Sequence, residues 1–146
     1  MPGTANALEA GTELPPLKKA ISQRQIDCYS GVRPKSIHTD VEWAKQKGFP
    51  APLAQALMST AYVSQMMVSW LGAGFIKGGK ISASFIKPVI VGDTLTARAV
   101  IKSCEEVGGR PRVSVECWCE NQHGVKTLVG SASGFTDHLR TRSKNG

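Results

Sequence analysis

The stretch from Gly48 to Ile76 contains no Asp, Glu, Lys or Arg, although 20% of the 146 residues in the chain are charged. Gln, Ser and Thr residues are spread through it, which argues against a membrane-spanning helix, since such a helix needs about 20 mostly apolar residues. Two prolines at its start suit a loop and a first helical turn, and two glycines near its end suit a helix stop. The pattern therefore predicts one helix from about Leu53 to Leu71 that is buried on nearly every side.

Four segments after this helix alternate between apolar and polar residues, which is typical of strands with one buried face. They read KISASFIKPV, DTLTARAVIKS, RVSVECWCE and VKTLVGSASGF. Short turns join them, so we expect an antiparallel meander in which consecutive strands pair. The expected core-facing residues of the second and third segments are Leu95, Ala97, Ala99 and Ile101, and Val113, Val115, Cys117 and Cys119.

Three shorter elements are expected before the long helix. LPPLKKAIS predicts a short extended segment, and Ser22 is placed to cap a helix over QRQIDCYSG. Thr39 and Glu42 have the spacing of a capping box, which predicts a second short helix, VEWAKQK, that Gly48 ends. The order of elements predicts an α+β protein with the hot-dog fold, in which a curved antiparallel sheet wraps one long buried central helix.

The length and the 41% of hydrophobic residues suit a single domain with a sizeable core. We expect a flexible N-terminal arm over residues 1–12, the hot-dog domain over residues 13–137 and a basic C-terminal tail over residues 138–146. No positively charged start precedes an apolar run, so no signal peptide is expected. The four cysteines lack CxxC or metal-ligand spacing, which predicts reduced thiols, a cytoplasmic location and no metal.

The net charge of +7 favours an anionic partner. Nucleic acid is disfavoured because the charges are scattered, apart from RTRSK in the tail, and because no basic strand is interleaved with aromatic residues. A small anionic ligand is the preferred interpretation, and plain solubility is the alternative. No glycine-rich phosphate loop or dinucleotide fingerprint occurs, so no cofactor is expected.

Two segments carry a resemblance to a known family. SIHTDVEWAKQKGFPAPLAQALMS resembles the hydratase segment of the MaoC-like family of (R)-specific enoyl-CoA hydratases and dehydratases, and SFIKPVIVGDTL resembles a later segment of that family. The resemblance covers residues 15–136 and implies a substrate that is an acyl thioester of coenzyme A or of an acyl-carrier protein. Because a sheet curled round one helix leaves its edge strands unpaired, we also expect a homodimer or a heterodimer with a related hot-dog chain.

The family adds water to a 2-enoyl thioester or removes it again. Its Asp and His orient the water, and a backbone amide at the start of the long helix receives the thioester oxygen. By the resemblance, His38 matches the catalytic histidine, and Ala56 takes the place of the glycine that provides the amide. Gln55 and Leu57 flank Ala56, and the resemblance implies that they contact the substrate.

Three positions depart from the family motif. Arg33 stands where the family has its catalytic Asp, and Lys35-Ser36 replaces an Asn-Pro pair. Gln55 replaces a histidine that precedes the helix. Arg33 cannot accept a proton, and we expect it to contact the substrate instead.

These departures leave two classes of function open. In the first, the chain is a hydratase or dehydratase in which His38 acts alone or with an acid from elsewhere, Asp40 being the nearest in the sequence. In the second, it is a catalytically impaired subunit that binds acyl-CoA and pairs with an active partner chain. A thioesterase is a third, less favoured alternative, because the central helix lacks the carboxylate that activates water in many thioesterases of this fold.

Overall fold

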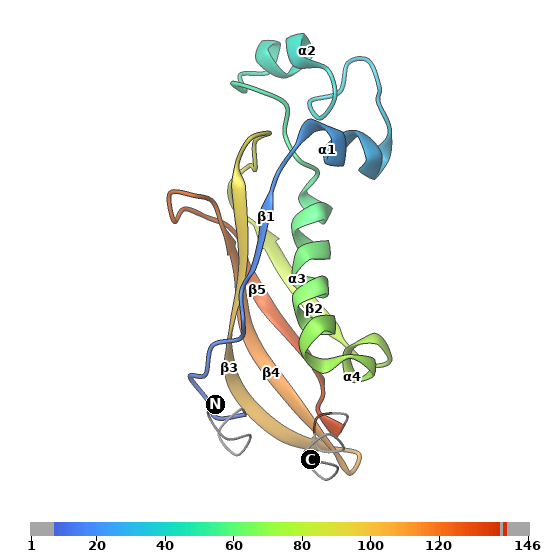
Figure 1. Ribbon diagram of the computed structural model, residues 1–146, viewed down its shortest axis with the longest axis vertical. Coiled ribbons are helices and arrows are strands. Elements are labelled where there is room, and N and C mark those ends of the chain that lie inside the picture. Colours follow the sequence, from blue (N-terminus) through green and yellow to red (C-terminus); the bar gives the residue numbers. More distant parts are fainter. Residues whose placement is uncertain (1–7, 138, 140–146) are drawn as a thin grey trace.

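The computed structural model describes residues 8–137 and residue 139. The elements in chain order are β1 (Leu17–Ala20), α1 (Gln23–Ser30), α2 (Val41–Gln46), α3 (Ala56–Leu71), α4 (Ala73–Ile76), β2 (Lys80–Phe85), β3 (Thr94–Val107), β4 (Arg110–Glu120) and β5 (Lys126–Phe135). The strands form one curved sheet, α3 lies along one face of it, and α1 and α2 lie together at one end of the molecule (Figure 1). The expected architecture of one long helix against a curved antiparallel sheet is confirmed.

The strand order is β1-β3-β4-β5-β2, and all pairs are antiparallel. The expected meander is correct for β3, β4 and β5, but it is wrong for β2, which pairs with β5 rather than with β3. The reason lies in residues 86–93, which do not form a tight turn. Val89 accepts a backbone hydrogen bond from Ala54, and Val91 donates one to Pro52, so this segment pairs with the segment before α3. As a result β2 is an edge strand of the sheet that the structure describes.

The core lies between α3 and the concave face of the sheet. The residues predicted to face the core on β3 and β4 are at most 1% exposed, as expected. They pack with the sheet-facing side of α3, which contributes Met58, Val63, Met66, Met67 and Leu71. Fully burying one aliphatic side chain of this size contributes roughly 1.5–3 kcal/mol, so this interface is the main source of stability.

The long helix differs from the prediction in two ways. It begins at Ala56 rather than near Leu53, because Leu53 forms a β-bridge with Ile90 and is held in extended structure. It is also not buried all round, since Leu57 is 60% exposed and Gln65 is exposed on the side away from the sheet. The absence of charges on that side therefore reflects something other than burial within this chain.

The two short helices test the capping predictions. Ser22 caps α1 as expected: its Oγ accepts from the Gln25 amide (3.2 Å), and its own amide donates to Gln25 Oε1 (3.0 Å). The predicted capping box of Thr39 and Glu42 is wrong, because the cap of α2 is Asp40, whose Oδ1 accepts from the Trp43 amide (3.0 Å). The Thr39 hydroxyl instead donates to the Arg33 carbonyl (2.7 Å), so it is not free to cap.

Within the described ranges, no helix has both the length and the apolar character that crossing a membrane requires. All four cysteines are free, and burial raises the pKa of Cys117 to about 11 and that of Cys119 to about 12.

Residues 1–7 of the predicted arm, and His138 and residues 140–146 of the predicted tail, lie outside the described residues. Gly11 and Thr12 of the arm exchange backbone hydrogen bonds with Ile101 of β3.

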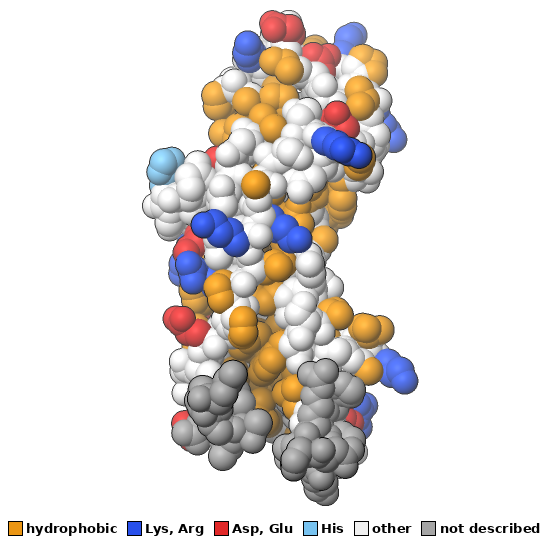
Figure 2. Space-filling view, in the orientation of Figure 1, with side chains coloured by type: hydrophobic (Ala, Val, Ile, Leu, Met, Phe, Trp, Pro, Cys, Tyr) orange, Lys and Arg blue, Asp and Glu red, His pale blue; other side chains and the backbone are white. Residues whose placement is uncertain are grey.

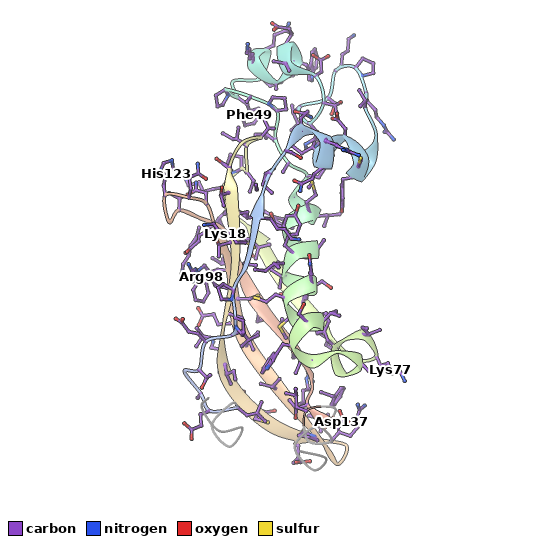
Figure 3. All side chains as sticks on the ribbon, viewed as in Figure 1. Lys18, Phe49, Lys77, Arg98, His123 and Asp137 are labelled. Carbon is purple, nitrogen blue, oxygen red and sulfur yellow. The ribbon has the colours of Figure 1, made fainter. Side chains whose placement is uncertain are left out.

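Charged side chains are mixed on the face shown in Figure 2, where Lys and Arg alternate with Asp and Glu without forming one patch. His123 lies in the exposed turn between β4 and β5, and its side chain points away from the sheet (Figure 3). This histidine therefore stands apart from the core.

Candidate active site

A pocket of about 340 Å³ lies at the N-terminal end of α3. Its walls come from the loop before α2, the start of α3, the segment that follows β2, and β5. The lining is mostly apolar, as is common in sites for small molecules. The lining residues are Ile37, His38, Leu53, Ala54, Ala56, Ser59, Phe85, Ile86, Lys87, Pro88, Val89 and Thr127. Two of the residues singled out from the sequence, His38 and Ala56, therefore share one pocket.

His38 is held by its ring and by its backbone. Its Nδ1 lies 2.8 Å from the carbonyl oxygen of Leu53, and its own carbonyl accepts from Gln23 Nε2 (2.9 Å). A carbonyl oxygen can only accept, so the hydrogen of the neutral ring sits on Nδ1 and the lone pair on Nε2. Such a ring can take a proton from a water molecule in the pocket through Nε2.

The start of α3 presents free backbone donors. Gln55 occupies the cap position without a side-chain cap hydrogen bond, and Ala56 is the first helical residue. The first amides of a helix have no partner within the helix, and the helix dipole adds partial positive charge at this end. No other described residue accepts a hydrogen bond from the Ala56 amide. A thioester oxygen that gains negative charge would be stabilised here.

The other three residues expected to contact a substrate do not line this pocket. The buried Gln55 side chain turns toward α1, where its Nε2 donates to the Ser30 hydroxyl (2.6 Å) and the Ile26 carbonyl (3.2 Å). Arg33 is exposed in the loop after α1, where its backbone amide donates to the Thr39 hydroxyl (2.9 Å). Leu57 is exposed beside the pocket.

No Asp or Glu is present among the described residues that line the pocket. Asp40, the acid nearest to His38 in the sequence, is used elsewhere as the cap of α2. Hydrogen bonds from the amides of Trp43 and Lys35 lower the pKa of the Asp40 carboxyl below its usual value. Asp40 is therefore ionised and bound to backbone donors, which makes it a poor source of a proton.

Sequence reasoning missed the segment from Phe85 to Val89, which forms one wall of the pocket. Its position depends on β2 lying beside β5, which brings Ile86 within a backbone hydrogen bond of Thr127 (2.9 Å). The available signal was the resemblance of SFIKPVIVGDTL, which contains these residues, to a segment of the family. That resemblance did not show that the segment lies against the start of α3.

Comparison with known proteins connects this geometry to a family. The family model described as "MaoC like domain" matches residues 7–126. The (R)-hydratase of A. caviae involved in PHA biosynthesis is similar in structure, with a TM-score of 0.73 and 23% identity over 88% of this chain and 97% of the hydratase. The R-hydratase PhaJ1 of Pseudomonas aeruginosa gives a TM-score of 0.71 and 24% identity over 88% of this chain and 81% of PhaJ1.

A chain of the ChsH1-ChsH2 complex of Mycobacterium tuberculosis is also similar, with a TM-score of 0.70 and 18% identity over 88% of this chain and 98% of that one. None of the curated proteins matches the sequence. The structural likenesses confirm the hot-dog fold, and the family match covers most of the chain, including both pocket residues predicted from the sequence. The chain belongs to the MaoC-like dehydratase family.

Proposed function

We propose that the pocket at the start of α3 binds an acyl thioester, and that the chain is a hydratase or dehydratase that adds or removes water at a 2-enoyl thioester. The observation that carries the proposal is the presence of His38 and Ala56 in one mostly apolar pocket. The (R)-hydratase of A. caviae has the same fold as this chain, and this likeness supports hydration or dehydration as the reaction. The four free cysteines fit a reducing compartment such as the cytoplasm.

Each residue has a defined part in the proposed reaction. The Ala56 amide donates to the thioester oxygen and stabilises the negative charge that develops on it. His38 Nε2 takes a proton from water while the water oxygen bonds to C3 of the enoyl group. The resulting imidazolium then gives a proton to C2. Since no carboxylate shares this work in the pocket, we expect turnover roughly 10²–10⁴-fold below that of a relative with an acid and a base in place.

A crotonyl-CoA hydration assay at high enzyme concentration tests the role of His38. We expect slow hydration by the wild type and none by His38→Ala, whereas the control His123→Ala changes an exposed histidine and leaves the rate unchanged. Because Arg33 is exposed and does not line the pocket, Arg33→Asp places a carboxylate outside it and should leave the rate unchanged. Wild-type hydration that survives His38→Ala would place the chemistry on other residues. Release of free thiol instead of hydration would favour a thioesterase.

The role of the Ala56 amide can be tested without disturbing the helix. Proline is well accepted at the first helical position, where its ring replaces an amide hydrogen that the helix does not use. Gln55 has φ −63° and ψ 135°, which is the conformation that a following proline requires. Ala56→Pro should therefore keep the melting temperature and lower hydration by roughly 10²–10³-fold. Leu57→Ala is the control, because it alters a neighbouring side chain and leaves the backbone donors intact. Equal hydration by Ala56→Pro and wild type would contradict the proposed oxygen site.

The second candidate is an acyl-CoA-binding subunit that works with an active partner chain. Two observations favour it: the described lining of the pocket lacks a carboxylate, and the free edge strand β2 runs directly into the pocket wall at Phe85 and Ile86. The ChsH1-ChsH2 complex supports such pairing in a similar fold. Mass spectrometry of the complex isolated from its native cell separates the candidates. A second hot-dog chain with an intact acid, together with no hydration by the isolated chain, would favour the subunit.

A further inference from the structure

A second hollow of about 370 Å³ lies on the convex face of the sheet, away from α3. Strand alternation fixes the face: Val113 and Val115 of β4 point into the core and are fully buried, so Arg112 and Ser114 point outward. Four strands contribute to the hollow. Its polar lining residues are Lys80, Ser82, Lys102, Arg112, Ser114, Ser131 and Ser133.

The strand register explains the shape of the hollow. Ser133 of β5 lies opposite Lys80 on one side and opposite Ser114 on the other. Ser82 lies opposite Ser131 in the next outward-facing row. Neighbouring strands are about 4.8 Å apart, so these short side chains form a floor of hydroxyl groups. Lys80, Lys102 and Arg112 have longer side chains that rise around this floor from three different strands.

No ion pair within residues 8–137 neutralises the three cations of the hollow. The ion pairs found among the described residues lie elsewhere and join Lys45 to Glu42, Arg98 to Glu120 and Arg110 to Asp137. Glu105 lies opposite Arg112 in register, and Glu116 lies opposite Ser131, but neither acid lines the hollow.

Arg112 is the most informative of these cations. Its Nη2 donates to the Ser133 hydroxyl (2.8 Å), which orients the guanidinium over the serine floor. Its Nε is buried and has no hydrogen-bond partner in the part of the chain that the structure describes. A buried donor on a charged group costs free energy when it stays unpaired, so an acceptor at this place would be stabilising. The positive charge of the donor favours an anion over a neutral acceptor.

We propose that this convex hollow binds a phosphate group. A guanidinium with a free Nε offers the fork geometry that phosphate oxygens accept, two lysines add charge, and serine hydroxyls donate to the remaining oxygens. Inorganic phosphate and the phosphorylated ribose of a nucleotide coenzyme share this chemistry. The proposal is independent of the function proposed for the His38 pocket, because it concerns the opposite face of the sheet.

Calorimetry at low salt tests the proposal with inorganic phosphate and adenosine 3′,5′-bisphosphate as probes. We expect Lys102→Ala and Arg112→Gln each to weaken binding roughly tenfold, as loss of one charged hydrogen-bond donor predicts. Lys18→Ala is the control, since it removes one exposed charge from β1 at the opposite edge of the sheet. Lys80→Ala and Lys102→Ala both change exposed side chains, so they carry the test even if Arg112→Gln fails to fold.

The position of the bound anion is measured by nuclear magnetic resonance. We expect the largest amide shift changes at Ser114, Ser131 and Ser133. Tighter binding of the bisphosphate than of phosphate would support a nucleotide coenzyme as the source, and equal binding would support phosphate itself. Absence of binding by both probes would overturn the proposal. Equal weakening by Lys18→Ala, or shift changes centred on Ala56 and Leu57, would also overturn it.

Discussion

The two edges of the sheet are built differently. β1 is four residues long and carries Lys18 and Lys19, and its chain passes directly into the capped helix α1. β2 is six residues long and leads into Phe85 and Ile86, which are each 48% exposed. Short edge strands with lysines resist pairing with another chain, whereas a longer edge flanked by exposed apolar residues invites it.

This difference indicates which edge of the described sheet is better suited to pairing with another chain. Both β1 and β2 are edge strands of the described sheet, but β1 is protected by its shortness and its lysines, whereas the β2 edge is open to pairing. The exposed Leu57 at the start of α3 lies beside the same pocket to which Phe85 and Ile86 contribute. We therefore propose that a dimer forms through β2, with the pocket next to the interface. The exposed, uncharged side of α3 fits this arrangement, because a partner chain can cover it.

The largest effect is expected from a charge placed at the open edge. Ile86→Lys removes an exposed apolar side chain from each copy and puts a lysine there, which should weaken a two-fold dimer by roughly 3 kcal/mol, or about 100-fold. Val107→Lys is the matched control, because Val107 is another exposed apolar residue at the far end of β3. Light scattering over a concentration series measures the change. A wild type that is a stable monomer at micromolar concentration would contradict the dimer.

The centre of the sheet, between the two edges, should respond to alkaline pH. Burial raises the pKa of the Cys117 thiol to about 11 and that of Cys119 to about 12, above the ordinary value of 9.0. The thiols therefore stabilise the fold fully below pH 9, and this contribution falls as pH rises toward 11 to 12, because the unfolded chain ionises first. We expect a loss of roughly 3 kcal/mol at pH 10.

Urea unfolding between pH 8 and 10.5 measures this loss. The double variant Cys117→Ala/Cys119→Ala serves as the control, since it should lose stability less steeply over the same range. Parallel curves for the two proteins would show that the thiols do not account for the pH dependence.

The protected β1 edge should respond only through stability. Ser22→Ala removes the hydroxyl half of the capping box of α1, in which the Ser22 Oγ accepts from the Gln25 amide, and should cost about 1 kcal/mol of unfolding free energy. Ser22→Asp keeps an acceptor at the cap and should recover most of it. Thermal unfolding measures the cost, and light scattering should show an unchanged oligomeric state. A change of oligomeric state in Ser22→Ala would contradict the expectation that the β1 edge takes no part in pairing with another chain.

The smallest effect is expected at the loop that carries His38. The lowered pKa of Asp40 means that its cap stabilises α2 above pH 3.8, and that this contribution is lost as pH falls below that value. Asp40→Asn keeps a good capping group but removes the titration, so its α2 should be less sensitive to acid. The indole signal of Trp43 in nuclear magnetic resonance spectra reports on α2 between pH 5 and 2.5. Identical acid sensitivity in both proteins would contradict this role of the carboxylate.

The sequence predicted which segments form helices and strands better than it predicted which strands pair with one another. Alternation placed the buried faces of β3 and β4 correctly, because each face depends only on local periodicity. The pairing of β2 with β5 could not be read in the same way, since it depends on hydrogen bonds between residues 86–91 and segments distant in sequence. The cap of α2 was misplaced for a related reason, as the Thr39 hydroxyl is engaged by Arg33.

The site was predicted through the family resemblance rather than through periodicity. His38 and Ala56 came from the motif, and the structure places both in one pocket. The side chain of Gln55 could not be oriented from the sequence, because its partners Ile26 and Ser30 lie on α1. The pocket wall from Phe85 to Val89 likewise required the strand order.

The pairing of β2 with β5 also bears on how the chain folds during synthesis. α3 and β2 leave the ribosome before β3 and β4, and the strand that holds β2 in the sheet is made last. Until β5 emerges, the apolar face of α3 has no complete sheet to cover it, and the nascent chain exposes it to solvent. Contacts between segments so distant in sequence form slowly, and uncovered apolar surface is prone to aggregate. Chaperone demand should therefore be highest while β3 and β4 are being translated, and it should end when β5 closes the sheet.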